Sequence, residues 1–192
     1  PGAGPSLRTA ARRRQRVVIS VCDITRAQPR QVMLEAILAE LDGVVRPDDV
    51  TVIVATGTHR ANTRDELETL LGARVVQSCR VVNHDARDES TLVELGMVDD
   101  VPVLLSREWI EADLRITTGF VEPHFFAGFS GGPKMVAPGL AGLPTILQMH
   151  NGRRIGDPRA TWGVCEGNPV PDAILAVAPV PPPAFALDSL PH

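Results

Sequence analysis

The sequence predicts an α/β fold built on a mostly parallel sheet, and three observations lead to this prediction. Short β-branched runs alternate along the chain with segments of helical spacing, as in sheets whose strands are connected by helices. The runs are apolar throughout, which is typical of strands covered on both faces. Each run also leads into a polar segment, and ligands gather at the carboxyl ends of parallel strands.

The first half of the chain supplies three strands and two helices. The strands cover residues 16–22 (RVVISVC), 50–55 (VTVIVA) and 80–82. One helix spans about residues 31–41, after Pro29. The next begins at Asn62 or Thr63, whose side-chain oxygen can accept from a free backbone N–H, and runs through Leu71. The polar segments after the strands should converge on one rim of the sheet.

The second half continues the pattern. Strands at residues 101–105 and 114–118 flank a short helix that contains Trp109, and further helices are expected at 143–151 and about 172–178. Residues 119–142, rich in Gly and Pro, look like neither a strand nor an amphipathic helix. A long Gly-rich stretch inside a compact domain usually has a functional reason. The whole pattern is Rossmann-like, a mostly parallel sheet flanked by helices.

Composition narrows the classes of function. The 192 residues are 44% hydrophobic and 22% charged, with a formal net charge of −4, the values of one ordinary globular domain. This mild acidity argues against a nucleic-acid partner, which needs a basic face. No apolar run approaches the ~20 residues of a membrane span. Three cysteines without a CxxC pair favour neither a disulfide framework nor structural zinc, and we expect a reduced, cytoplasmic setting.

Residues 128–134 (GFSGGPK) form a candidate anion site. Closely spaced glycine N–H groups, the Ser130 hydroxyl and the Lys134 cation suit a phosphate. The loop is not a Walker A motif, because its GK[ST] ending is absent and a Pro precedes the lysine. An irregular loop with an exposed lysine is the alternative, and spacing alone does not decide between the two.

Three histidines, His59, His124 and His150, fall on predicted loops or helix ends near the same rim. Each alone is compatible with a hydrogen-bonded structural role. Together they favour proton transfer at neutral pH or metal binding. His84, in the Asn83-His84-Asp85 turn, has either a direct role or the task of orienting its neighbours.

Asp23 and Arg26 follow the first strand. The planar guanidinium of Arg26 matches a carboxylate or a phosphate, and the alternative is a local salt bridge at a helix start. Trp109, Met149 and Trp162 are expected to pack in the core.

Taken together, these segments resemble the nickel-dependent lactate racemase family. The resemblance covers about residues 16–172. It rests on Asp23-Ile24-Thr25-Arg26 with Pro29, on 55–60 (ATGTHR), 83–85 (NHD), 122–134 (EPHFFAGFSGGPK) with Pro138-Gly139, and on 147–151 (LQMHN). The 122–134 block is specific, whereas Gly-Thr-His-Arg alone is weak.

The resemblance implies a cofactor, the nickel pincer nucleotide, which is a pyridinium-3,5-bisthiocarboxylic acid mononucleotide carrying Ni. Lys134 resembles the lysine that joins this cofactor through a thioamide. His150 resembles the protein ligand that completes a square-planar nickel, a geometry that suits Ni(II). Ser130, Gly131 and Gly132 would help to seat the cofactor phosphate.

The resemblance also implies the reaction, racemisation or epimerisation of lactate or a related 2-hydroxy acid. The C–H bond is not acidic enough for a side-chain base, so hydride goes to the cofactor while the hydroxyl proton leaves. The planar 2-keto acid then receives hydride on either face. His59 and His124 resemble the paired acid/base histidines, one for each enantiomer. Arg26 resembles the arginine that holds the substrate carboxylate, with Asp23 its companion near the first histidine.

The expected organisation is a flexible lead-in over residues 1–15, a cofactor-binding α/β catalytic domain over 16–178 and a truncated connector over 179–192 toward a C-terminal domain missing from this chain. Family members are longer, and their second lobe adds substrate and cofactor contacts, so we expect this fragment to hold cofactor without efficient turnover. Pro171 stands where a histidine or another polar residue is expected in relatives.

Two other interpretations remain. A non-catalytic nucleotide-binding module of the same fold is compatible with the missing lobe. An NAD-dependent dehydrogenase has little support, because no GxGxxG follows the first strand.

Overall fold

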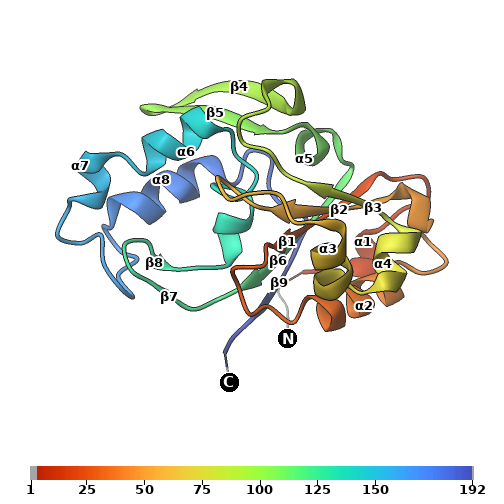
Figure 1. Ribbon diagram of the computed structural model, residues 1–192. Helices are drawn as coiled ribbons and strands as arrows, with labels where there is room; N and C mark the ends of the chain where they lie inside the picture. Colours follow the sequence, from red (N-terminus) through yellow and green to blue (C-terminus); the bar gives the residue numbers. More distant parts are fainter. Residues whose placement is uncertain (1–3, 192) are drawn as a thin grey trace.

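The computed structural model describes residues 4–191, and its centre is a five-stranded parallel sheet of order β3-β2-β1-β6-β9 (Figure 1). The strands are β1 (Val17–Cys22), β2 (Val50–Ala55), β3 (Arg80–Asn83), β6 (Leu114–Phe120) and β9 (Phe185–Ser189). The register of β1 on β2 ends at Cys22↔Ala55, so their carboxyl ends are level. The predicted α/β fold with a mostly parallel sheet is confirmed.

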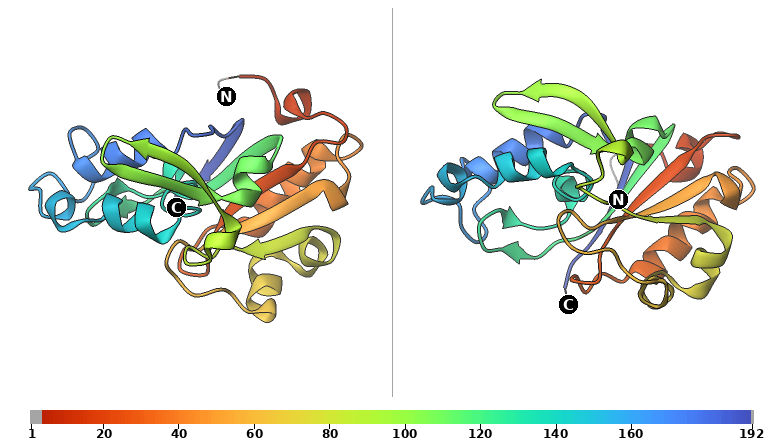
Figure 2. Two further views of the ribbon diagram at one scale, coloured as in Figure 1. Left: turned by 90° about the horizontal axis from the view of Figure 1, so that it is seen from above. Right: turned by 45° about the horizontal axis from the view of Figure 1, so that its top comes forward.

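Helices cover both faces of this sheet (Figures 1 and 2). On one side lie α1 (Leu7–Ala10), α2 (Arg30–Leu41), α3 (Arg64–Leu71) and α4 (Ala73–Ser78). The other side carries α5 (Arg107–Glu111), α6 (Leu143–Met149), α7 (Gly152–Ile155) and α8 (Pro169–Val177). Three 3₁₀ turns complete the helical elements, η1 (Pro47–Asp49), η2 (Glu89–Thr91) and η3 (Gly132–Met135).

Alternation along β1 divides the core in two. Val17, Ile19 and Val21 pack with α2, whereas Val18 packs with Trp109 and the α6–α8 side, because successive side chains of a strand point to opposite faces. On the α6–α8 face the apolar run gives way to Ser20, whose hydroxyl donates to the Met135 carbonyl at 2.8 Å. Beyond Ser20 on that face, a separate small apolar cluster of Cys22, Phe120 and Met135 fills the carboxyl end of β1.

The strand expected at residues 101–105 lies outside the central sheet. β4 (Leu92–Val98) and β5 (Val101–Ser106) form a separate antiparallel hairpin. Its tight turn holds Asp99 at φ 51°, a left-handed conformation that Asp tolerates. The prediction missed β4, most of which is not buried. The hairpin packs on α6, where the Thr145 hydroxyl accepts from Leu104 N–H.

Several boundaries differ from the predicted ones. α8 begins at Pro169 rather than near residue 172, because the Asn168 side chain caps it by accepting from Val170 N–H. Within the Gly-rich stretch, β7 (Pro123–His124) pairs with β8 (Gly128–Phe129).

The two end segments also hold structure. α1 lies in the expected lead-in, of which residues 1–3 fall outside the described part, and β9 lies in the expected connector, of which residue 192 does. Trp109 and Met149 are buried as predicted, but the prediction for Trp162 was wrong, since 59% of it is exposed. Among residues 4–191 there is no helix long and apolar enough to cross a membrane.

Candidate functional site

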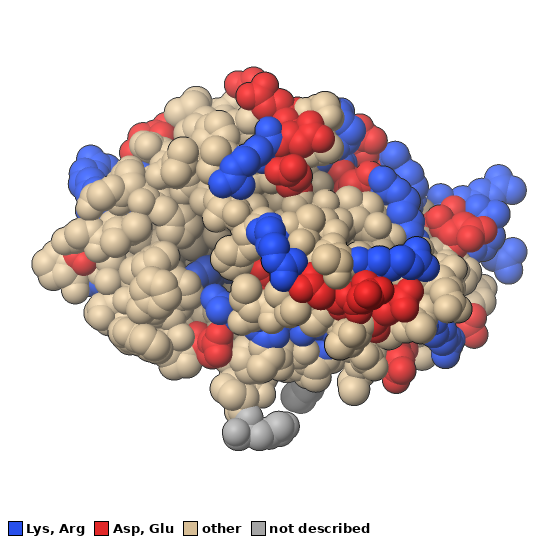
Figure 3. All heavy atoms as spheres, viewed as in Figure 1, with Lys and Arg blue, Asp and Glu red and all other residues tan. Residues whose placement is uncertain are grey.

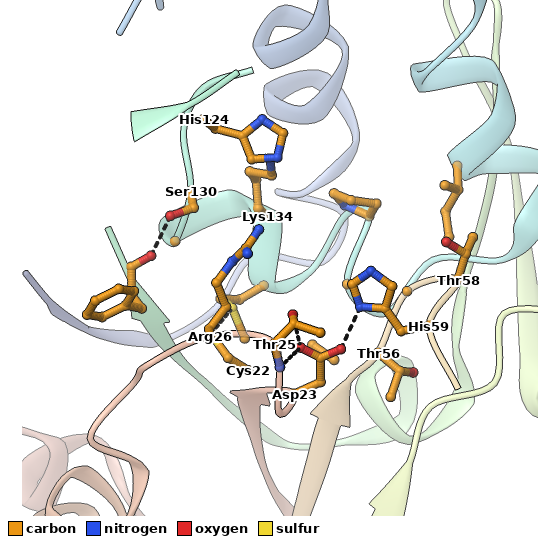
Figure 4. A pocket seen from close by; sticks show the side chains of 18 of the residues that line it. Cys22, Asp23, Thr25, Arg26, Thr56, Thr58, His59, His124, Ser130 and Lys134 are labelled. Atoms are coloured by element: carbon orange, nitrogen blue, oxygen red, sulfur yellow. Dashed lines mark hydrogen bonds and ion pairs between the residues drawn. The ribbon is translucent and has the colours of Figure 1, made fainter. Parts of the chain in front are cut away.

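A cavity of about 580 Å³ opens at the carboxyl ends of β1, β2 and β6. On the face shown in Figure 3, basic and acidic side chains are interspersed. Eight of the nine site residues predicted from the sequence line the cavity, namely Asp23, Arg26, His59, His124, Ser130, Gly131, Lys134 and His150. Gly132 does not. Because parallel strands end at the same edge of a sheet, residues that are far apart in the sequence lie together in this cavity (Figure 4).

Asp23 and His59 form a close polar contact in the cavity, 2.6 Å between Oδ2 and Nδ1 (Figure 4). A carboxylate only accepts, so the imidazole Nδ1 carries the hydrogen and Nε2 keeps its lone pair in the neutral ring. Asp23 is held in turn by the backbone N–H and hydroxyl of Thr25, both donating to Oδ1. The pair therefore presents a histidine with a fixed tautomer.

Arg30, which the sequence analysis missed, supports the loop that carries Asp23 and Arg26. Its side chain is buried, and it donates to the carbonyls of Cys22 (2.8 Å), Gln28 (3.0 Å), Arg26 (2.6 Å) and Asp23. Burial lowers the pKa of this guanidinium. Four carbonyls of one turn converge on one planar cation, so the turn has little freedom. In sequence, Arg30 looks like any first-turn helix residue.

We predict that Arg30→Lys destabilises the chain by about 2–4 kcal/mol, since an ammonium cannot reach all four carbonyls and each buried one left unpaired costs about 1 kcal/mol. The midpoint of urea unfolding measures the change. Arg46→Lys is the matched control, because Arg46 is exposed and pairs only with Asp49. Equal midpoints for the two variants would contradict the proposed support.

Arg26 pairs with Glu122 rather than with Asp23, at 3.4 Å between Nε and Oε1. Both side chains are about one-third exposed, so the pair is worth little stability. The local Asp23–Arg26 salt bridge considered from the sequence is not formed in this structure. The guanidinium of Arg26 is thus placed in the cavity with a carboxylate that an incoming anion can replace.

His124 sits among aromatic rings, stacked on Phe125 at 4.7 Å and edge-on to Phe126 at 4.6 Å. Its Nδ1 accepts from Ala127 N–H at 3.3 Å, so the neutral ring carries its hydrogen on Nε2. Burial, followed by the charges of Lys134 and Arg26, lowers the pKa of His124 to about 4. At neutral pH this ring is uncharged, with the tautomer opposite to that of His59.

Lys134 is the only lysine of the chain. It lies in η3, and its Nζ is 5.9 Å from the centroid of the Phe126 ring. Burial, together with the charge of Arg26, lowers the pKa of its amine to about 7. A substantial fraction of this amine is therefore uncharged at neutral pH, which makes it a nucleophile.

His150 ends α6, and its Nδ1 is 2.9 Å from the Ile146 carbonyl. This bond fixes the hydrogen on Nδ1 and leaves the Nε2 lone pair free, the arrangement usual for metal-binding histidines. Burial lowers the pKa of His150, so the ring stays neutral and able to coordinate. The described residues contain no group of three or more His, Cys, Asp or Glu side chains placed to hold a metal ion.

The Gly-rich loop is tied down by its own polar groups. The Ser130 hydroxyl donates to the Phe120 carbonyl at 2.6 Å and accepts from Glu122 N–H at 3.0 Å (Figure 4). Gly132 N–H donates to the carboxylate of Asp188, on β9, at 3.1 Å. Ser130 and Gly131 still line the cavity, but the Gly132 N–H is engaged by an internal anion.

Asp188 reaches this loop only because residue 119 is a glycine. Gly119 pairs with Asp188 across β6 and β9, and a Cβ at Gly119 would lie 1.9 Å from Oδ1 of Asp188 and 3.0 Å from the Gly132 nitrogen. Gly131 itself has φ 70°, where a side chain is strained. Neither Gly119 nor Asp188 stands out in the sequence, because their role depends on strand pairing.

His84 lies outside the cavity and is buried. Its Nε2 donates to the Ala141 carbonyl at 2.9 Å, and its own carbonyl accepts from the Thr56 hydroxyl. The sequence left two roles open for His84, and this geometry supports the second. His84 orients its neighbours, namely the loop after β2 and the segment before α6.

Comparisons with known proteins identify the family of this chain. The family model described as lactate racemase N-terminal domain matches residues 1–163. Curated lactate racemases of Lactiplantibacillus plantarum and Thermoanaerobacterium thermosaccharolyticum are 37% and 36% identical over 164 and 165 residues. Each alignment covers 85% of this chain and 39% of the relative. The chain thus spans about two fifths of the length of these relatives.

Two solved structures share the fold. The lactate racemase apoprotein of Thermoanaerobacterium thermosaccharolyticum matches with a TM-score of 0.93 and 32% identity, over 100% of this chain and 46% of that one. A protein of Thermotoga maritima matches with a TM-score of 0.80 and 21% identity, over 96% of this chain and 49% of that one, a likeness of fold alone. With the family match covering most of its length, this chain belongs to the lactate racemase N-terminal domain family.

Proposed function

We propose that the protein to which this chain belongs racemises or epimerises lactate or a related 2-hydroxy acid, using a nickel pincer nucleotide held in the cavity. One observation carries the proposal: an arginine, three histidines and the lysine of the chain, each matched to a role above, line the same cavity. The chain spans 39% of the curated relatives. We therefore assign turnover to the whole protein. We propose that the region corresponding to the part of the relatives that this chain does not cover also contributes to turnover.

The residues present fit the cofactor. Lys134 would carry it, through the amine that burial keeps partly uncharged, and His150 would supply a nitrogen ligand from its free Nε2. Because residues 4–191 hold no group of three or more His, Cys, Asp or Glu side chains suited to a metal ion, a metal in this cavity must bring most of its ligands with it. A pincer nucleotide does so, and when bound it supplies an acceptor for hydride from the substrate.

The protein side of the reaction follows from the hydrogen bonds. Arg26 would hold the substrate carboxylate in place of Glu122, which fixes the position of the reacting carbon. His59 presents a lone pair on Nε2 for the hydroxyl proton, and Asp23 stabilises the imidazolium that results. His124 presents an N–H from its own Nε2. Opposite tautomers give the cavity one proton acceptor and one proton donor.

The low pKa of His124 belongs to the cavity before cofactor and substrate are in place. Two of its causes are the charges of Lys134 and Arg26. A thioamide at Lys134 has no charge, and a carboxylate on Arg26 offsets the other. Both changes raise the pKa of His124, while burial, the largest cause of the lowered value, still acts on the ring.

Nickel content tests this proposal. After expression with the enzymes that make the cofactor, the chain should retain stoichiometric nickel and show a mass increase on the peptide containing Lys134. His150→Ala should lose most of the nickel, whereas Gln148→Ala, on the same helix but bonded to Asp100, should keep it. Absence of nickel from the wild-type chain, with tight binding of ordinary mononucleotides, would favour the non-catalytic module instead.

The compartment is part of the proposal. Cys22, Cys79 and Cys165 are all free thiols, and burial raises the pKa of Cys22 to about 11 and also raises that of Cys79. Thiols of this kind persist in a reducing environment. We therefore propose that the protein acts in the cytoplasm.

A further inference from the structure

We propose that the chain without cofactor has a second chemistry, the capture of 2-oxo acids as a Schiff base on Lys134, with Arg26 holding the carboxylate. The ligand class is defined by two adjacent groups, a carboxylate and a ketone carbon. This site uses two residues of the proposed racemase cavity, but it needs neither nickel nor turnover.

The position of the amine is the first support. Lys134 extends from η3 into a cavity whose other lining includes Phe120, Phe126 and Ile146. Apolar walls around an amine disfavour its charged form. Because the chain has no other lysine, no other side-chain amine can form an imine with the carbonyl compound.

A second cation near the amine is the next support. Arg26 is close enough to lower the pKa of Lys134, adding to the larger effect of burial, and that pKa is about 7 instead of 10.5. Desolvation and a neighbouring cation are the two means by which proteins activate lysines for carbonyl chemistry. At neutral pH the amine is therefore available as a nucleophile without a separate base.

Arg26 also defines which carbonyl compounds fit. Its Nε already contacts a carboxylate, that of Glu122, at 3.4 Å, so a carboxylate is accepted at this point of the cavity. A 2-oxo acid bound there would present its ketone carbon one bond away from the held carboxylate. A ketone without a carboxylate lacks this anchor.

The reaction balances without an oxidant or a reductant. The Nζ lone pair attacks the ketone carbon, and the proton lost from nitrogen passes to the former carbonyl oxygen, giving a carbinolamine. The hydroxyl then takes a second proton and leaves as water while nitrogen forms the C=N bond. His59 and His124, which line the same cavity, are placed to exchange these protons.

The experiment uses the 192-residue chain purified from cells that lack the cofactor-making enzymes. The chain is incubated with pyruvate at neutral pH, treated with sodium borohydride and analysed by intact mass and peptide mapping. We expect one added group, equal to pyruvate minus water plus two hydrogens, on the peptide that contains Lys134. The N-terminal amine, present in every variant, is the internal reference for non-specific labelling.

Two variants and one alternative reagent test the roles. Arg26→Gln should lower the yield on Lys134 by about tenfold or more, since losing a guanidinium–carboxylate pair costs at least this factor. Arg153→Gln, an exposed arginine away from the cavity, should leave the yield unchanged. Acetone in place of pyruvate should label Lys134 no better than it labels the N-terminus.

Labelling of the N-terminus alone in the wild-type chain would overturn the capture site. Equal labelling by pyruvate and acetone, or no effect of Arg26→Gln, would overturn the assigned carboxylate anchor. These measurements are made on metal-free protein. A negative result therefore leaves the nickel test untouched, and a failed nickel test leaves this one untouched.

Discussion

Replacing His124 by Gln in the protein of full length is expected to lower kcat for racemisation by roughly 10²–10⁴, the factor contributed by a positioned acid/base group. His59→Gln should do the same, because one histidine takes the hydroxyl proton of one enantiomer and the other returns a proton to the keto oxygen when the opposite enantiomer forms. KM should change little in both variants, since the substrate carboxylate is held by Arg26. Rates of D-lactate formation from L-lactate measure the effect.

The control for this pair is Glu94→Gln on the exposed strand β4, which should leave both constants unchanged. Asp23→Asn adds a sharper test, because the amide does not impose the Nδ1–H tautomer on His59. It should reduce kcat while His124 keeps its own hydrogen bond to Ala127. If either histidine variant kept a rate within about tenfold of the wild type, its acid/base role would be refuted.

Lys134→Met is expected to stabilise the chain below pH 7 although it removes the amine on which both proposed chemistries depend. Methionine fills similar space without a charge, and a buried cation without a paired carboxylate costs on the order of 1 kcal/mol or more. For a chain of this size, about 1 kcal/mol corresponds to a rise in Tm of roughly 2–4 °C. Thermal unfolding of the two chains at pH 6 and pH 10 measures it.

The pH dependence follows from the direction of the pKa shift. In the folded chain the pKa of Lys134 is about 7, and the ordinary value is 10.5. Between these values the unfolded chain binds more protons, so wild-type stability rises with pH through this window. The advantage of Lys134→Met is therefore complete below pH 7 and vanishes above the ordinary pKa. A variant equally stabilised at both pH values, or destabilised at pH 6, would show that Lys134 is not a buried cation.

The parts of the fold predicted from the sequence are those that local pattern controls. The apolar runs of β1 and β2 are easily recognised in the sequence. The polar segments that follow them lie at the carboxyl ends of the strands, where ligands bind to parallel sheets. β4 and β9 could not be predicted in the same way. β4 carries a glycine and exposed residues, and β9 is a strand because it pairs with β6, a tertiary contact that no short window contains.

The residues of the site also fall into those that a local sequence pattern predicts and those that it does not. Side chains with distinctive chemistry, such as His59, His124 and Lys134, could be proposed from their positions after strands and in the Gly-rich stretch. Residues that hold others in place could not. Arg30 acts through four backbone carbonyls, and Glu122 acts through its distance from Arg26. Their contacts are created by folding, so they are seen only in the folded structure.

The link from Asp188 to Gly132 bears on where a shortened version of this chain can end. A fragment ending at residue 163, where the family match stops, would lack α8 and β9. One edge of β6 would then be unpaired, and the carboxylate that accepts from Gly132 N–H would be missing. The stretch recognised by sequence is thus shorter than the unit that keeps the lysine-bearing turn in shape. Expression boundaries are better placed beyond residue 189.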